Sequence, residues 1–132
     1  MKVVAIDYGT SKIGFAVSDE TGLIARGLEV LRVKNGSKLV NLVVKRLADL
    51  KPELVVVGVP YGWKGKDSPQ TESVRDFISA LEGEIGVSVE TWDESYSTQR
   101  AERGAKGRRK KNSDSEAARI ILQEFLDHRN ES

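Results

Sequence analysis

Residues 3–17 read VVAIDYGTSKIGFAV, and this stretch decides how the fold begins. Two apolar runs, 3–6 and 13–17, flank the turn-forming Gly9-Thr10-Ser11, a pattern that predicts an antiparallel hairpin. A second turn at 19–22 precedes an alternating segment, 23–33, which we expect to be a third strand of the same meander.

Downstream, apolar spacing predicts helices separated by buried strands. The expected helices cover 37–50, 68–83, 97–103 and 113–128, the expected strands 53–58 and 87–92, and residues 104–112 a loop. Strands alternating with helices after a meander indicate a mixed sheet flanked by helices, in the α/β class. A chain of 132 residues suits one domain, which we expect to span 1–132.

The composition excludes several kinds of chemistry. There is no cysteine and only one histidine, so disulfides, thiolate zinc sites, cysteine nucleophiles and two-histidine metal sites are ruled out. A hydrolytic metal must then be held mainly by oxygen atoms, which favours Mg²⁺ or Mn²⁺. The N-terminus reaches a charge after four apolar residues, so we expect a cytoplasmic protein without a signal or a membrane span.

Acidic residues fall at the ends of elements that the predicted order brings together. Asp7 ends the first strand, Asp93 and Glu94 end the last strand, and Asp114 opens the last helix. Carboxylates gathered at one sheet edge would repel each other unless cations bind between them, and two Mg²⁺ held there suit phosphodiester hydrolysis. Taken singly, Asp114 is more simply explained as a helix cap and the 93–94 pair as turn residues.

The positive charge is concentrated near the last helix. Net charge is only +1, yet residues 103–111 hold six basic side chains and no acid. Such a run is either a solvated loop or a phosphate-binding element. Its position just before Asp114 favours the second interpretation, and Lys64, Lys66 and Trp63 lie in another glycine-rich loop that could add charge and a stacking surface.

Four blocks of the chain resemble one family. Residues 6–19 (IDYGTSKIGFAVSD) resemble the opening signature of the YqgF family, small ribonuclease H-like proteins also described as RuvX-type Holliday junction resolvases. Residues 56–65 (VVGVPYGWKG), with the helix from Thr71, are similar to its Gly-x-Pro loop, and 92–102 (WDESYSTQRAE) to its acidic strand end. Residues 108–126 (RRKKNSDSEAARIILQEFL) resemble its basic run and last helix.

The resemblance implies a ribonuclease H-like fold, in which a three-stranded antiparallel meander is followed by two parallel strands. It also implies a metal-dependent nuclease that matures the 5′ end of precursor 16S rRNA, with Asp7, Glu94 and Asp114 as catalytic and metal-binding carboxylates. Strand alternation allows only one of Asp93 and Glu94 to face the metal, and the family pattern favours Glu94. The expected nucleic-acid-binding residues are Lys12, Lys64, Lys66, Arg108, Arg109, Lys110 and Lys111.

The chain departs from the family pattern at three positions. Ser95 stands where arginine is common, Lys64 where an acid is common, and Lys12 where arginine is common. Lysine is a point charge that cannot fork onto phosphate, so substrate positioning is where the pattern is weakest.

Three alternatives remain open at this point. A Holliday junction resolvase cuts two strands symmetrically and should be a homodimer, whereas an enzyme that trims RNA can act as the monomer we expect by default. A non-catalytic RNA-binding assembly factor would retain the acids for structure. A nucleotide binder is suggested by residues 7–14, which resemble the first phosphate loop of the sugar kinase and actin superfamily, although that superfamily uses two such domains.

Overall fold

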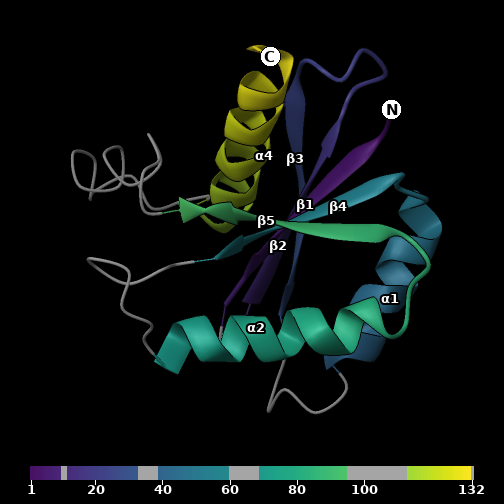
Figure 1. The fold of residues 1–132 in the computed structure, drawn as a ribbon, viewed down its shortest axis with the longest axis vertical. Helices are drawn as coiled ribbons and strands as arrows, with labels where there is room; N and C mark the ends of the chain where they lie inside the picture. Colours follow the sequence, from purple (N-terminus) through teal and green to yellow (C-terminus); the bar gives the residue numbers. More distant parts are fainter. Residues whose placement is uncertain (10–11, 33–38, 60–68, 95–112, 132) are drawn as a thin grey trace.

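The computed structural model describes residues 1–9, 12–32, 39–59, 69–94 and 113–131, which build one five-stranded sheet with helices on both faces (Figure 1). The strands are β1 (Val3–Tyr8), β2 (Lys12–Ser18), β3 (Ala25–Arg32), β4 (Leu54–Val59) and β5 (Ser88–Asp93), in the order β3-β2-β1-β4-β5. β1, β2 and β3 pair antiparallel, and β4 and β5 continue parallel to β1. The predicted mixed sheet is confirmed.

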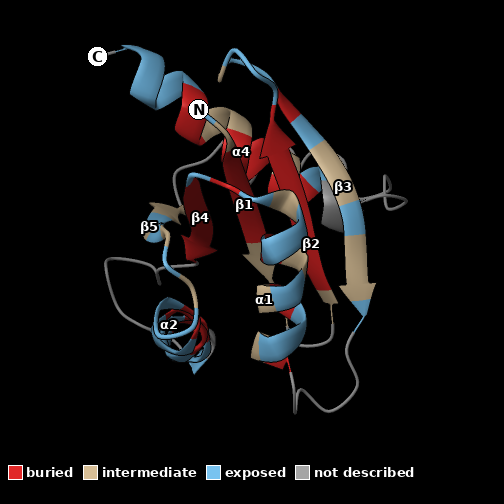
Figure 2. Cartoon of the chain, turned by 90° about the vertical axis from the view of Figure 1, so that its right-hand side faces the viewer, coloured by how far each residue is buried: buried red, intermediate tan, exposed pale blue. Residues whose placement is uncertain are grey.

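Two helices cover one face of the sheet and one covers the other (Figure 2). α1 (Leu39–Leu50) and α2 (Pro69–Glu82) pack on one face, and α4 (Ser113–Glu131) packs on the opposite face. Side chains along β1 alternate between the two cores: Val4 and Ile6 join the α1/α2 side, whereas Val3 and Ala5 join the α4 side. We call these two surfaces the α1/α2 face and the α4 face.

β4 lies inside the sheet, which explains its composition. All six of its residues, LVVVGV, are buried, as expected for a parallel strand covered by helices on both faces. The predicted strand 53–58 is therefore correct to within one residue at each end.

The turn between β2 and β3 is built around Asp19, as the sequence predicts. The backbone N–H of Gly22 donates to the carbonyl of Asp19 at 3.1 Å, and Gly22 has φ +75°, which favours glycine. Asp19 Oδ1 accepts from Thr21 Oγ1 at 2.7 Å and from the Leu23 N–H at 3.2 Å. The Thr21 hydrogen bond, followed by backbone ones, lowers the pKa of Asp19 from its ordinary value.

α4 is fixed in direction by hydrogen bonds near its C-terminal end. The Gln123 side chain accepts from the Ala25 N–H at 2.9 Å and donates to the Leu23 carbonyl at 2.8 Å, and Asn130 donates to the Gly22 carbonyl at 3.1 Å. The C-terminal half of α4 is thus attached to the β2–β3 turn, beside the start of β1. Its N-terminal end consequently points toward the edge where β1 and β4 end (Figure 1).

The remaining predicted elements divide between confirmed and undescribed ones. α1, α2 and β5 confirm the elements expected at 37–50, 68–83 and 87–92, with Pro69 as the first residue of α2. The helix predicted at 113–128 begins at the expected residue and runs three residues further. The short helix expected at 97–103 and the loop at 104–112 lie outside the described residues. No helix within the described residues is both long and apolar enough to cross a membrane.

Candidate active site

Asp7 lies near the end of β1 on the α4 face. Val3 and Ala5, which precede it at alternate positions, both belong to the α4-side core, so strand alternation places Asp7 on the same face. It is half-buried and sits opposite Gly14 of β2. The next residue, Tyr8, is on the α1/α2 face, where its ring stacks on Phe77 of α2 at 4.5 Å between centroids.

Glu94 follows β5 directly and lies over the backbone of β4. A Cβ built on Gly58 would stand 2.9 Å from Glu94 Oε2, 3.2 Å from Glu94 Cδ and 2.6 Å from Ile121 Cδ1 of α4. The carboxylate and the isoleucine therefore occupy the space that any other residue at position 58 would fill. Val56, two residues earlier, belongs to the α4-side core, so Gly58 presents this space on the α4 face.

Asp93 and Glu94 lie on opposite faces of the sheet, because successive side chains along β5 alternate between the two faces. Trp92 packs against the α4-side core, its ring meeting Phe125 edge-on at 6.0 Å, and its Nε1 donates to Glu124 at 3.3 Å. Asp93 is opposite Val59, a residue of the α1/α2-side core. The structure thus has Glu94, and not Asp93, on the face that carries Asp7.

Asp114 belongs to the first turn of α4, and its side chain lies outside the described part of the structure. Along the helix it precedes Ala118 by four residues and Ile121 by seven, the spacing of positions on one helix face. Ala118 and Ile121 are both fully buried against the sheet. The backbone of α4 therefore carries position 114 on its sheet-facing side, one turn beyond the buried part.

The donor set suits a hard divalent cation. Asp7 and Glu94 supply carboxylate oxygens on one face of the sheet, the donor type that Mg²⁺ and Mn²⁺ prefer. Within the described residues there is no group of three His, Cys, Asp or Glu that could hold a metal ion. Two of the three predicted ligands are thus close to this edge of the sheet, and the third belongs to the first turn of α4.

Of the predicted nucleic-acid-binding residues, only Lys12 is described. It is half-buried at the start of β2. Lys64, Lys66, Trp63 and the run Arg108, Arg109, Lys110 and Lys111 lie outside the described residues.

Gly58 was not singled out by sequence reasoning, although a signal was present. A glycine inside an otherwise β-branched strand, LVVVGV, indicates a close approach of another group to the backbone. The identity of that group, Glu94, required the register of β4 and β5.

The chain matches a known protein family. The family model described as RuvX, Holliday junction resolvase, matches residues 1–128. A protein named "Putative pre-16S rRNA nuclease" from Halothermothrix orenii is 35% identical over 98% of this chain and 97% of its own, and one of the same name from Desulforamulus reducens is 36% identical over 96% and 97%. RuvC from Thermus thermophilus, in complex with a Holliday junction substrate, shares the fold with a TM-score of 0.65 at 20% identity, over 98% of this chain and 96% of that one. This chain therefore belongs to the RuvX family.

Proposed function

We propose that this protein is a metal-dependent endonuclease that hydrolyses phosphodiester bonds in 5′ maturation of precursor 16S rRNA. The names of its relatives support the substrate. The observation that carries the proposal is the Glu94 carboxylate seated over Gly58, on the same sheet face as Asp7. Glycine at position 58 of the buried strand β4 leaves room for this carboxylate. Close packing of apolar side chains does not by itself require an acid there.

We assign the metal to Asp7, Glu94 and Asp114 and expect Mg²⁺ or Mn²⁺. When bound, such an ion supplies Lewis acidity and lowers the pKa of water for attack on phosphorus. The chain's own residues hold the carboxylates in place. Gly58 and Ile121 confine the Glu94 carboxylate, and β1 fixes Asp7 on the same face of the sheet, half-buried beyond Val3 and Ala5.

The nucleic acid would be bound through its phosphates. We assign this role to Lys12 and to the cationic segments that carry Lys64, Lys66, Arg108, Arg109, Lys110 and Lys111. Contacts of this kind do not depend on sequence and weaken with salt. Trimming of an RNA end needs a single active site, so we expect the working form to be a monomer.

The test is a cleavage assay with three isosteric variants. Wild type, Asp7→Asn, Glu94→Gln and Asp93→Asn are incubated with a precursor 16S rRNA fragment and with a four-way DNA junction, each with Mn²⁺, Mg²⁺ or EDTA. We expect metal-dependent cleavage of the RNA that Asp7→Asn and Glu94→Gln abolish. Asp93→Asn is the matched control, because it removes a neighbouring charge from the opposite face of β5, and it should retain activity.

The other outcomes select the alternatives. Symmetric nicking of the junction by a homodimer would assign the protein to DNA recombination, the role that the family description and the likeness to RuvC support. Equal binding of both substrates by wild type and Asp7→Asn, without cleavage in any metal, would identify a non-catalytic RNA-binding factor.

A further inference from the structure

Two cationic residues are paired across β2 and β3, at the end of these strands that lies away from the β2–β3 turn. The register pairs Lys12, the first residue of β2, with Arg32, the last residue of β3. The adjacent pair, Ile13 and Leu31, packs into the α1/α2-side core. Strand alternation therefore places Lys12 and Arg32 on the α4 face, the face that carries Asp7.

This pair is close to Asp7 along the sheet. Asp7 is opposite Gly14 of β2, which is two residues from Lys12 on the same face, and Gly14 is opposite Val30 of β3, two residues from Arg32. The end of β1 and the two cations thus form one continuous strip of the α4 face at the edge of the sheet.

Such an arrangement has an electrostatic cost. Like charges directly opposite each other on neighbouring strands destabilise a sheet, because their Cβ atoms are only about 5 Å apart. On the other face of β3, the charge of Glu29 is compensated by Arg46 of α1, whose Nη2 donates to Glu29 at 2.8 Å. Arg32 is exposed and, unlike Lys12, has no polar partner within the described part of the chain.

We propose that Lys12 and Arg32 together form a phosphate clamp that holds the polynucleotide backbone beside Asp7. Arg32, which has no polar partner within the described part of the chain, can receive a phosphate beside Lys12, and the arginine fork matches two phosphate oxygens. Arg32 is thereby a substrate-positioning residue beyond the set inferred from sequence. The clamp rests on the proposed nuclease function for its substrate, but it acts in binding and not in the chemical step.

The binding test compares the two arginines of β3. Arg32→Gln removes the clamp charge, and Arg26→Gln removes the same charge from the other end of the strand, where Arg26 is opposite Val17 on the α1/α2 face. Fluorescence anisotropy with a labelled precursor 16S rRNA fragment, in EDTA and at several KCl concentrations, reports affinity and its salt dependence. Arg32→Gln should weaken binding about tenfold and reduce the salt slope by about 0.7 to 0.9, the value for one lost phosphate contact. Arg26→Gln should change neither.

Further readouts separate the clamp from a folding effect and from the nuclease proposal. Arg32→Gln should melt no lower than wild type at low salt, because Arg32 is exposed and has no polar partner within the described residues whose loss would destabilise the fold. With Mn²⁺ it should raise KM and leave kcat at saturating substrate unchanged. If Arg32→Gln and Arg26→Gln bind with wild-type affinity and slope, the clamp is refuted even where cleavage is observed. If binding depends on Arg32 but no metal supports cleavage, the nuclease proposal fails and the clamp stands.

Discussion

The strongest structural constraint near the candidate site is the missing side chain of Gly58, and Gly58→Ala tests it directly. The added Cβ would meet Ile121 Cδ1 at 2.6 Å and Glu94 Oε2 at 2.9 Å. Carbon atoms pack at about 3.5 to 4.0 Å, so at least one of the two side chains must move. Both are the ends of side chains with rotatable bonds, so we expect a local rearrangement and not loss of the fold.

Two effects of different size follow. Inserting a methyl group into a packed interior costs about 1 to 3 kcal/mol, which for a chain of this length lowers Tm by roughly 4 °C per kcal/mol. Displacing Glu94 has a larger functional effect. Changes to groups that orient a metal ligand typically cost about 10- to 100-fold in metal affinity or activity, and we expect a loss in that range.

The assay separates packing from ligand placement by a second substitution. Ile121→Val deletes Cδ1, the nearest atom to the new methyl group. The double variant with Gly58→Ala should therefore lose less stability than the sum of the losses of the two single variants. The contact with Glu94 remains, so Mn²⁺ affinity by calorimetry and RNA cleavage should stay low. Gly86→Ala is the matched control, since a Cβ there meets nothing within 4 Å.

A clear result would refute this reasoning. If Gly58→Ala binds Mn²⁺ and cleaves RNA as wild type does, the position of Glu94 over Gly58 is irrelevant to function. If its free energy of unfolding is also unchanged, the close packing of β4 against α4 is itself wrong.

Two further predictions concern stability away from the site. Ser18→Ala should lower the free energy of unfolding by about 1 to 3 kcal/mol in urea titrations, because the buried Ser18 Oγ accepts the Val3 N–H at 2.9 Å. The control Ser79→Ala, at an exposed position, should change the free energy of unfolding by under about 0.5 kcal/mol. Equal losses in the two variants would contradict a stabilising role for the Ser18–Val3 hydrogen bond. Arg46→Gln should cost less than about 1 kcal/mol at pH 7, since the pair with Glu29 is partly exposed. The hydrogen bond from Arg46 holds the pKa of Glu29 below its ordinary value of 4.5, so the stabilisation is present above pH 4.5 and is lost as the pH falls through the lowered pKa. A difference between wild type and Arg46→Gln that persists at pH 2 would show that it does not come from this pair.

The sheet could be predicted from sequence because its strands carry strong local signals. β4 is continuously apolar over LVVVGV, and the β2–β3 turn contains an Asp and a Gly at the positions its hydrogen bonds require. These signals depend on neighbours within a few residues. The meander and the buried strand therefore follow from local chemistry, with ends shifted by one or two residues.

The arrangement of the site depends on contacts between distant residues, which the same signals do not encode. Alternation shows that one of Asp93 and Glu94 faces α4, but choosing between them requires the register of β5 against β4. The pairing of Lys12 with Arg32 depends on a register shift in β3 opposite residues 14–16, which no local pattern predicted. Gly58 carried a signal, yet its partner Glu94 is 36 positions further along the chain.

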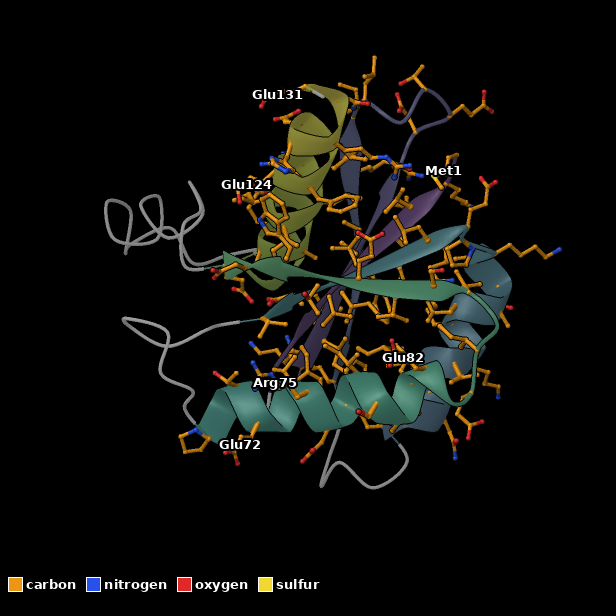
Figure 3. The ribbon with its side chains drawn as sticks, in the orientation of Figure 1. Met1, Glu72, Arg75, Glu82, Glu124 and Glu131 are labelled. Carbon is orange, nitrogen blue, oxygen red and sulfur yellow. The ribbon has the colours of Figure 1, made fainter. Side chains whose placement is uncertain are left out.

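The distribution of charge limits the directions from which a polyanion can approach. Residues 69–94 carry seven acidic side chains and one basic, and residues 113–131 carry five acidic and two basic. Figure 3 shows Glu82 near the C-terminal end of α2 and Glu124 and Glu131 along α4. Glu124 lies beside β5, where it accepts from Trp92 Nε1, whereas Glu131 lies at the C-terminal end of α4, next to the β2–β3 turn. A phosphate backbone crossing β5 would meet Glu124 and the acids of β5 itself, Glu90 and Asp93, whereas the ends of β2 and β3 present Lys12 and Arg32. If the clamp is correct, the polynucleotide reaches Asp7 from the ends of β2 and β3 that carry Lys12 and Arg32, and reversing the charge of Arg32 should slow association more than reversing that of Arg26.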